Sequence, residues 1–313
     1  MKLLLPDSVE LDPLLPPGVH AVRYAVGRPI PGEHTDAEAL VVWGNPGHQL
    51  RDSAARLPDL RWVQTLAAGP DAVLDAGFPP GLLITSGAGL HDRTVAEHTL
   101  TLVLAAARRV HLLVRAQIGH RWAAEWGGVQ PIREPGSFRT LRDAHVVIWG
   151  FGGIAATLAP LLAALGARVT GVARTAGTRR GFPIVTADDF PEVLPTADVL
   201  INILPATPDT THALGAAVLS LLPGHAWVVN VGRGSTLDEA ALLAAIRTGK
   251  LGGAALDVTE TEPLPPESGL WDEPNVIISP HAAGGRPLGA DELVSENLAA
   301  LLDGRPMRNV VQG

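Results

Sequence analysis

Residues 145–155 read His-Val-Val-Ile-Trp-Gly-Phe-Gly-Gly-Ile-Ala, an apolar run that enters a glycine turn and then a helical stretch. A glycine at position 150 permits a tight turn, and a glycine at position 152 lets a diphosphate approach the backbone. The first turn of the helix offers free N–H groups and the positive end of its dipole. We therefore predict a dinucleotide site rather than a turn with only a structural role. The residues predicted to form it are Gly150, Phe151, Gly152, Gly153 and Ile154.

The strand expected next, residues 168–172, carries the information on cofactor choice. An acidic residue at its end would bind the ribose 2′-hydroxyl and repel a 2′-phosphate. The chain instead has Ala173, Arg174 and Thr175 there, with Arg179 and Arg180 close by. Because a guanidinium matches a phosphate in shape and charge, we predict a preference for NADP(H), with NAD also possible. The alternative is a solvated arginine beside a pocket that accepts both.

Short apolar runs separated by helical stretches predict an α/β protein with two doubly wound, parallel-sheet domains of the Rossmann type. The first 90 residues hold expected strands at Lys2–Leu5, Ala21–Ala25, Ala39–Trp43, Trp62–Thr65 and Leu82–Thr85. The second set is expected at His145–Trp149, Arg168–Val172, Val199–Asn202, Ala226–Asn230, Gly253–Leu256 and Val276–Ile278. Helices are expected at Leu237–Thr248 and at Asp291–Asp303, and the latter should fold back on the first domain.

A long helix is predicted from Thr94 to Gln117, between the two sets of strands. It is apolar nearly all round, so a domain or subunit interface should bury it. The loop that follows, Gly119–Leu141, contains Trp122 and Trp126, which we expect at a subunit interface. Four histidines cluster around the helix without a carboxylate pattern that would indicate a metal, so we predict no metal site there and interpret them as structural or subunit-contact residues. They are His91, His98, His111 and His120.

The composition excludes several classes of protein. The 313 residues carry a formal net charge of -8 with no long basic tract, which argues against a nucleic-acid surface. There is no cysteine, so disulfides and thiolate chemistry are excluded. No apolar run approaches the roughly 20 residues of a membrane span, and Pro6 and Asp7 interrupt the apolar N-terminus too early for a signal peptide. We therefore expect a cytoplasmic protein with no membrane partner.

Three later segments each place one chemically useful side chain after an expected strand. They contain Arg233, Glu262 and His281. Ligands of open α/β sheets bind beyond the carboxyl ends of the strands, where all three segments belong. Reduction of a 2-oxo acid needs a planar cation for the carboxylate, a proton donor for the carbonyl oxygen and a carboxylate that orients this donor. Arginine, histidine and glutamate fit these three roles.

The three segments resemble the motifs of the D-isomer-specific 2-hydroxyacid dehydrogenase family, in particular its glyoxylate/hydroxypyruvate reductases. They run over Asn230–Gly234, Asp257–Pro263 and Pro280–Gly284, in the order and at the spacing of the family. The resemblance continues in the loop Leu204–Thr210, in Val95–Glu97 and in Ala67–Asp71. It therefore spans essentially the whole chain.

The resemblance implies an oxidoreductase that transfers a hydride between NAD(P)H and a small 2-oxo or 2-hydroxy acid of D configuration. Arg233 would bind substrate, Glu262 would orient His281, and His281 would act as acid and base. The further cofactor contacts implied are Val95, Leu204, Pro205, Thr210, Val231, Gly232 and Asp257, of which Asp257 would reach the nicotinamide carboxamide. The further substrate contacts implied are Ala67, Ala68 and Gly69.

The resemblance also implies how the chain is divided and assembled. The cofactor domain, residues 93–283, would be inserted into a substrate domain made of residues 1–92 and 284–313. A homodimer would form through the long helix and the following loop. Two alternatives stay open at this point: a regulatory protein that binds dinucleotide on the same scaffold, and a phosphite- or formate-type dehydrogenase.

Overall fold

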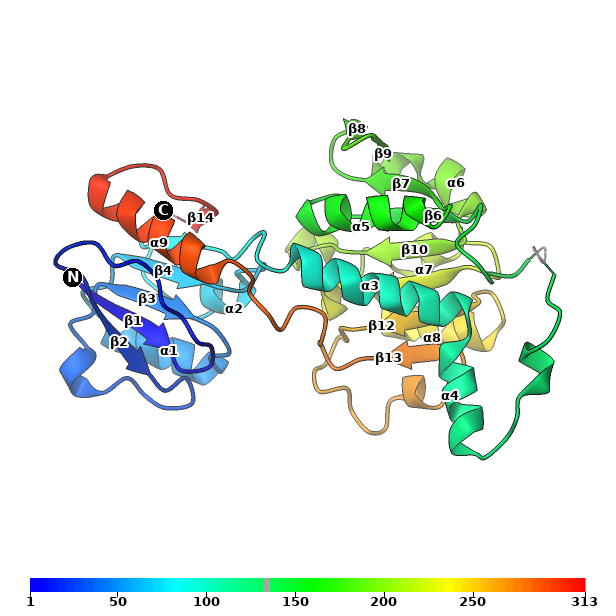
Figure 1. Ribbon diagram of the computed structural model, residues 1–313, viewed down its shortest axis with the longest axis horizontal. Coiled ribbons are helices and arrows are strands. Elements are labelled where there is room, and N and C mark those ends of the chain that lie inside the picture. The colour runs from blue at the N-terminus through cyan, green and yellow to red at the C-terminus, as the bar shows by residue number, and fades with distance from the viewer. Residues whose placement is uncertain (132–135, 313) are drawn as a thin grey trace. The chain divides into compact units, whose positions relative to one another are not determined.

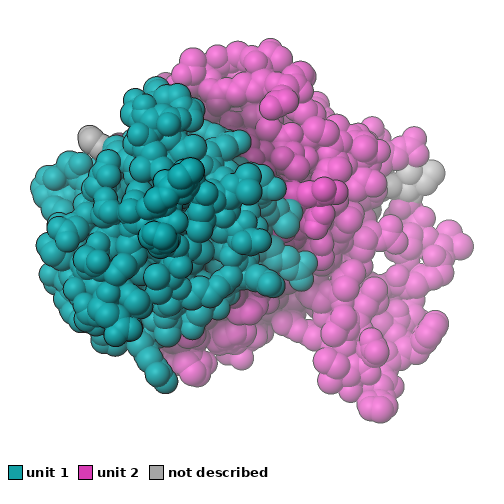
Figure 2. Space-filling model, turned by 60° about the vertical axis from the view of Figure 1, so that its left-hand side comes forward, with its two compact units in different colours: residues 1–91, 285–313 teal, residues 92–284 magenta. Residues whose placement is uncertain are grey.

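The computed structural model describes residues 1–131 and 136–312, which form two compact units. Unit 1 contains residues Met1–His91 and Gly285–Gly313, and unit 2 contains Asp92–Gly284 (Figure 2). Each unit is built on its own sheet with helices, so the predicted architecture of one α/β domain inserted into another is confirmed. Residues 132–135 of the predicted loop Gly119–Leu141 lie outside the described residues.

Unit 1 has a 6-stranded sheet with the order β14-β5-β4-β3-β1-β2. Its strands are β1 (Lys2–Pro6), β2 (His20–Tyr24), β3 (Ala39–Val42), β4 (Trp62–Thr65), β5 (Leu83–Thr85) and β14 (Val310–Gln312). Its helices are α1 (Gly47–Arg56), α2 (Asp71–Leu74) and α9 (Ala290–Asp303). All neighbouring pairs are parallel except β14 with β5, so the chain end adds an antiparallel strand that we had not predicted.

The inner strands of unit 1 are apolar on both faces, because helices cover both faces of the sheet. Leu3 points to a cluster that includes Leu293 and Leu298 of α9, so the last helix folds back on this unit as predicted. Its sequence neighbour Leu4 points to the other face, in a cluster with Leu50 of α1. This alternation follows from the two-residue period of a strand, and burial on both faces is typical of parallel sheets.

Unit 2 has an 8-stranded sheet with the order β13-β12-β11-β10-β6-β7-β9-β8. Its strands are β6 (His145–Trp149), β7 (Arg168–Val172), β8 (Gly177–Arg179), β9 (Phe182–Val185), β10 (Val199–Asn202), β11 (Trp227–Asn230), β12 (Gly253–Leu256) and β13 (Val276–Ile278). Its helices are α3 (Asp92–Ala107), α4 (Val110–Ile118), α5 (Gly153–Ala164), α6 (Phe190–Val193), α7 (Ala216–Leu219) and α8 (Glu239–Arg247). The order steps outward from β6 in both directions, which is the doubly wound arrangement.

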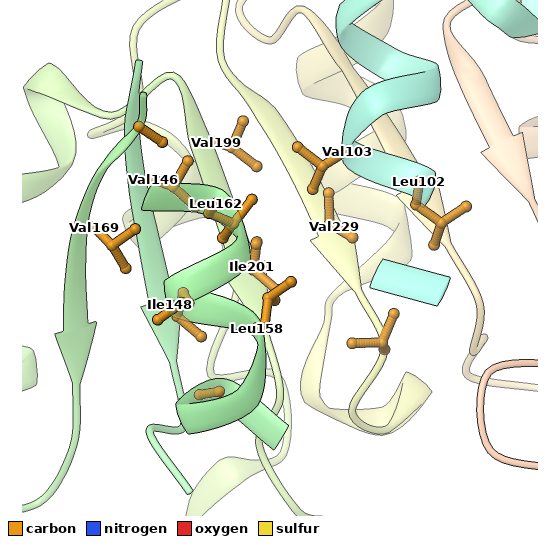
Figure 3. Close-up of a cluster of buried hydrophobic side chains, with 14 of the residues drawn as sticks. Leu102, Val103, Val146, Ile148, Leu158, Leu162, Val169, Val199, Ile201 and Val229 are labelled. Atoms are coloured by element: carbon orange, nitrogen blue, oxygen red, sulfur yellow. The ribbon is translucent and has the colours of Figure 1, made fainter. Parts of the chain in front are cut away.

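Two hydrophobic clusters cover the two faces of the unit 2 sheet. On one face α3 and α5 pack against each other and against the strands, with Leu158 and Leu162 of α5 beside Ile148 and Ile201 (Figures 1 and 3). On the other face the short helices α6 and α7 and the longer α8 cover the strands. Since β6, β10, β11, β12 and β13 are parallel, their carboxyl ends lie at one common edge.

The predicted long helix Thr94–Gln117 is wrong as a single element. It is divided into α3 and α4 at Arg109, whose φ of 54° lies in the left-handed region (Figure 1). A left-handed residue ends the regular i→i−4 hydrogen bonds of a helix. The guanidinium of Arg109 lies over the ring of Trp126, 5.9 Å from its centroid, so a contact distant in sequence accompanies the break. α3 is buried as expected, whereas α4 buries only Ala116.

The prediction of six strands for this sheet is also wrong, because β8 and β9 add an edge hairpin. The two strands are antiparallel, and β9 joins the sheet beside β7. In residues 177–185, Pro183 interrupts the short apolar stretch Phe182–Val185, and two glycines and two arginines precede it, a composition more typical of a loop. The hairpin places Arg179 and Arg180 near the end of β7.

A buried histidine, His145, lies at the edge of the unit 2 sheet opposite to the carboxyl ends of its parallel strands. His145 begins β6 and is 3% exposed; its Nε2 lies 3.0 Å from Thr170 Oγ1 and its Nδ1 3.0 Å from Thr196 Oγ1. Burial, with a smaller effect of the Arg168 charge, lowers the pKa of His145 to about 4. An unfolded histidine has a pKa of about 6.5.

We predict that the free energy of unfolding falls as the pH is lowered from about 6.5 towards about 4, because the unfolded chain binds a proton that folded His145 does not. His145→Gln should make this fall less steep. Urea midpoints measured at intervals between neutral pH and about pH 4.5 provide the test. Replacement of exposed His20 by Gln is the control, and equal slopes for the two variants would contradict the prediction.

Candidate active site

The glycine turn after β6 is built as the sequence predicts. Gly150 has a φ of 98°, and a Cβ on it would lie 2.7 Å from the carbonyl oxygen of Ile203, so only glycine fits. Gly152 precedes the first residue of α5, and nothing lies within 4 Å of the position that a Cβ would take there. The backbone at Gly152 therefore faces open space, as the approach of a diphosphate requires, whereas the next residue, Gly153, lies against Asp92.

The side chains of the other predicted residues in this turn serve the core. Phe151 is 5% exposed and packs against Gly171, whose Cβ would lie 2.3 Å from the Phe151 ring. Ile154 packs against the same hydrophobic cluster. Gly153 is exposed, and a Cβ on it would lie 2.1 Å from a carboxylate oxygen of Asp92. Only the backbone of Phe151 and Gly153 is thus available to a dinucleotide.

Arginines surround the end of β7. Ala173 is partly buried, and Arg174 and Thr175 are exposed. Arg179 reaches across from β8, where its Nη1 donates to the carbonyl oxygen of Phe151 at 3.1 Å and its Nη2 to that of Thr175 at 3.4 Å. The edge hairpin is thereby attached to the glycine turn, and its positive charge lies close to the end of β7.

The loop after β10 is closed by its own side chains. The Thr210 hydroxyl donates to the carbonyl oxygen of Pro205 at 2.7 Å and accepts from the amide of Thr207 at 2.8 Å. Leu204 packs against the core, and its amide donates to Asn202 Oδ1 at 3.1 Å. Pro205 is exposed. Thr210, predicted to contact cofactor, shapes the loop through these bonds.

Arg233 is presented by a loop that buried amides hold in place. Asn230, the last residue of β11, donates through Nδ2 to the Arg233 carbonyl oxygen at 3.1 Å, and its Oδ1 accepts from the Gly232 amide at 3.1 Å. The hydroxyl of buried Thr236 donates to the same Arg233 carbonyl at 2.6 Å. Asn202 connects both, because its Nδ2 lies 3.0 Å from Asn230 Oδ1 and 2.6 Å from Thr236 Oγ1.

The two glycines beside Arg233 bring neighbouring loops into contact. A Cβ on Gly232 would lie 2.6 Å from the Leu204 carbonyl oxygen, and one on Gly234 would lie 1.9 Å from that of Thr259. Val231 is buried in the core. The Arg233 loop therefore fits between the loops that follow β10 and β12, and the Arg233 side chain is partly exposed.

Glu262 and His281 form the predicted pair. His281 Nδ1 lies 2.8 Å from Glu262 Oε2, while Glu262 Oε1 accepts from the amide of Thr259 at 3.2 Å. Because the carboxylate can only accept, Nδ1 carries a hydrogen and Nε2 is left to bind or release a proton. Both side chains are open to solvent, at 49% exposed for His281 and 39% for Glu262. A small molecule can therefore reach them.

Asp257, predicted to contact the nicotinamide, directly follows β12, and it bonds to the loop that carries His281. It is 2% exposed. Its carbonyl oxygen accepts from the His281 amide at 2.7 Å, and its carboxylate accepts from the amides of Ala282 at 2.9 Å and Ala283 at 3.0 Å. His281 has a φ of 51°, which costs a residue with a side chain roughly 1–2 kcal/mol. Asp257 supplies the bonds that offset this cost.

The remaining predicted residues lie elsewhere. Ala67, Ala68 and Gly69 belong to unit 1, in the loop after β4. The Ala67 amide donates to Thr65 Oγ1 at 3.1 Å and the Ala67 carbonyl accepts from Gly87 at 2.7 Å, so this residue secures the loop. Val95 lies on α3, is 6% exposed and packs in the core of unit 2.

Sequence reasoning missed four polar residues that support the site: the buried Asn202, Thr236 and Thr259 and the partly buried Ser279. A polar residue directly after an apolar strand, as in Ile201–Asn202 and Val229–Asn230, was an available signal. A polar group at that point can satisfy the backbone where the strand pairing ends.

A pocket of about 430 Å³ in unit 2 does not belong to this site. Its lining includes Trp126, from the segment after α4, and His225, Trp227 and Gly252, which lie at or just before the starts of β11 and β12. That edge is opposite to the carboxyl ends, so the chemistry argued above is not located there. In residues 1–131 and 136–312 no group of three or more metal-ligating side chains is found, and no helix there has the length and apolarity for a bilayer.

Comparison with known proteins agrees with this geometry. Residues 100–283 match the sequence profile of the D-isomer specific 2-hydroxyacid dehydrogenase, NAD binding domain. The chain is 33% identical to a glyoxylate reductase of Aeropyrum pernix, over 83% of this chain and 78% of that protein. It is 33% identical to glyoxylate/hydroxypyruvate reductase A of Salmonella newport, over 90% of this chain and 88% of the relative.

Solved structures give the same result. A D-isomer specific 2-hydroxyacid dehydrogenase of Xanthobacter autotrophicus Py2, in complex with NADPH and MES, is 32% identical with a TM-score of 0.78, covering 95% of this chain and 90% of that one. An NADPH-dependent glyoxylate/hydroxypyruvate reductase of Sinorhizobium meliloti, in complex with NADP and sulfate, is 29% identical with a TM-score of 0.79, covering 94% and 91%. The chain belongs to the D-isomer specific 2-hydroxyacid dehydrogenase family.

Proposed function

We propose that this chain reduces a small 2-oxo acid of the glyoxylate or hydroxypyruvate type to the D-2-hydroxy acid, with NADPH as the preferred cofactor. The observation that carries the proposal is the Glu262–His281 pair, at 2.8 Å and open to solvent, on the loops that follow β12 and β13, next to the loop of Arg233 after β11. The names of the relatives from Aeropyrum pernix and Salmonella newport support the substrate class.

The dinucleotide would be held by the backbone of Gly150–Ile154, by Arg174 and by the loop Leu204–Thr210, with Asp257 near the carboxamide. When bound, it supplies the hydride for the carbonyl carbon. His281 donates a proton from Nε2 to the carbonyl oxygen, and Glu262 stabilises and orients the imidazolium. In the oxidative direction, neutral His281 accepts the hydroxyl proton through the same atom.

Arg233 would bind the substrate carboxylate and stabilise the charge that develops on the substrate. Of the substrate contacts predicted in unit 1, Ala67 supports its own loop rather than a substrate, because its amide already donates to Thr65.

We predict that His281→Ala lowers kcat for glyoxylate or hydroxypyruvate reduction by about 10²–10⁴-fold, because the proton donor is lost. Glu262→Gln, which cannot balance the imidazolium charge, should lower kcat by a smaller factor. The measurement is steady-state NADPH oxidation with a panel of 2-oxo acids, and with formate and phosphite in the oxidative direction with NADP⁺. His20→Ala, an exposed histidine of unit 1, is the control.

Two results would contradict the proposed reaction. Turnover of formate or phosphite but of no 2-oxo acid would assign another dehydrogenase activity. Tight dinucleotide binding without turnover of any compound would favour a regulatory role on this scaffold. Full activity of His281→Ala would remove this residue from the mechanism.

The cofactor preference is proposed from the exposed guanidinium of Arg174 and from Ala173, which offers no carboxylate to the ribose. The relatives of known structure from Xanthobacter autotrophicus and Sinorhizobium meliloti were crystallised with NADPH and NADP. An arginine beside a 2′-phosphate forms a charge-assisted hydrogen bond with it. NADH has no 2′-phosphate and cannot accept this bond.

Arg174→Ala should lower kcat/KM for NADPH by about tenfold to a hundredfold, the equivalent of one hydrogen bond to a charged group, and leave kcat/KM for NADH nearly unchanged. Both values are measured at saturating 2-oxo acid. Arg142→Ala, an exposed arginine before β6, serves as the matched control. An equal loss with both cofactors would contradict a contact with the 2′-phosphate.

We further propose that a second copy of the chain covers α4. Its exposed apolar side chains are Val110, Leu113, Val114 and Ile118, the last 74% exposed. The segment that follows adds Trp122 at 92% and Val129 at 102% exposed. Large apolar groups gathered on one element are typical of a protein interface.

Val114→Glu combined with Ile118→Glu should convert a dimer into monomers, because two charges would be buried without partners. Sedimentation velocity of the wild type and the variant measures this. Leu288→Glu combined with Leu302→Glu places the same charges on exposed apolar positions of unit 1 and should leave the dimer intact. A monomeric wild type would contradict the proposal.

A further inference from the structure

Asp257, which follows β12, holds the turn that carries His281. Asp257 accepts the amides of His281, Ala282 and Ala283, three successive donors, through its carbonyl and carboxylate oxygens. Two of these amides, those of Ala282 and Ala283, converge on the carboxylate, and successive amides that do so form a fixed concavity for an anion. The position of His281 therefore depends on where the Asp257 carboxylate is held.

The carboxylate is in turn held from the side of α3. Ser279 Oγ lies 2.6 Å from Asp257 Oδ1, and His98 Nε2 lies 2.9 Å from Ser279 Oγ and 3.2 Å from the same Oδ1. The carboxylate can only accept, so the serine proton points to Asp257. The hydrogen between His98 and Ser279 must then belong to His98 Nε2, which donates to Ser279 Oγ and lies within reach of Oδ1.

The helix that carries His98 is a firm base for this chain of contacts. The neighbouring positions Val95 and Thr99 are buried, and α3 packs against α5 and against β11 and β12. His98 itself has a side chain 24% exposed. It connects a packed helix to a buried carboxylate, and its polar contacts are with Ser279 and Asp257 rather than with Glu262 or His281.

We propose that His98 is a positioning residue for the acid–base chemistry: through Ser279 and Asp257 it fixes the loop that presents His281 to Glu262. The inference rests on the proposed function and adds a residue to it. Without the His98 donor, Asp257 Oδ1 loses a neighbour that limits its rotation. The amides of Ala282 and Ala283, which bond to the carboxylate, would then follow it, and the imidazole of the neighbouring His281 would leave its productive orientation.

The test compares His98→Leu with His98→Gln, since the glutamine side chain keeps an N–H donor near the position of Nε2. His98→Leu should lower kcat for 2-oxo acid reduction by about tenfold to a hundredfold, the cost typical of a group displaced by about 1 Å. The KM for NADPH should change less than threefold, the solvent isotope effect on kcat should increase, and His98→Gln should recover most of kcat. Thr101→Leu, an exposed position of the same helix, is the control.

A spectroscopic measurement separates this inference from the proposed function. The protein is labelled with ¹⁵N at histidine. The ring signals of His281 are identified as those that disappear in His281→Ala. The spectrum of Glu262→Gln then shows how far these signals move when the Glu262–His281 contact is weakened. His98→Leu should move them towards the Glu262→Gln position, and His98→Gln should not. This readout needs no turnover, so it decides the role of His98 even if no 2-oxo acid is reduced.

If His98→Leu does not fold, Ser279→Ala interrupts the same chain of contacts one step later and should give the same two effects. The proposal holds if a folded variant shows the displaced His281 signals and, in an active enzyme, the lower kcat. Unchanged signals in a folded variant overturn it. A loss of activity that only follows the folded fraction also overturns it.

Discussion

The parallel register of β11, β12 and β13 is the constraint on which the site depends. Their pairing brings the carboxyl ends of three strands to one edge, and the loops that leave them carry Arg233, Glu262 and His281 in turn. No two of these residues are close in sequence. Strand spacing of about 4.8 Å places the starts of neighbouring loops within reach of each other's side chains. The sheet thus brings the three loops close together, and the loops need only orient their side chains.

The orientation of each loop is set by polar residues at the ends of the strands, where the backbone pairing stops. Asn230 and Asp257 immediately follow or end a strand, are 0% and 2% exposed, and receive or donate several hydrogen bonds each. A buried polar group without a partner costs about 1–3 kcal/mol, so each of these residues binds its loop only in the geometry that satisfies it. The polar groups therefore act as constraints on the loop rather than as a large source of net stability.

Much of the fold and of the site could be predicted from the sequence. Glycine at 150, the apolar strands, and the Glu262–His281 pair all follow from local chemistry or from motif order, and the structure shows the turn and the contact. The break at Arg109 could not be predicted, because it contains no glycine or proline and accompanies a contact with distant Trp126. The hairpin β8–β9 was missed since an exposed edge needs little apolar sequence. The sequence indicates only a structural or subunit-contact role for His98. Its contacts with Ser279 and Asp257 define which part of the structure it supports.

Within the site the reacting side chains are exposed and the residues that position them are buried. This difference explains why residues far from the reacting groups are needed to hold them. An exposed pair such as Glu262 and His281 typically gains only about 0–1 kcal/mol, which is too little to hold two side chains in one orientation. Substrate access requires that exposure. The orientation must then come from the backbone, and for His281 the backbone is in a left-handed conformation that a free loop would leave. Buried Asp257 can impose it because its hydrogen bonds are protected from water. Exposure of the reacting groups and burial of the groups that position them are therefore two parts of one requirement.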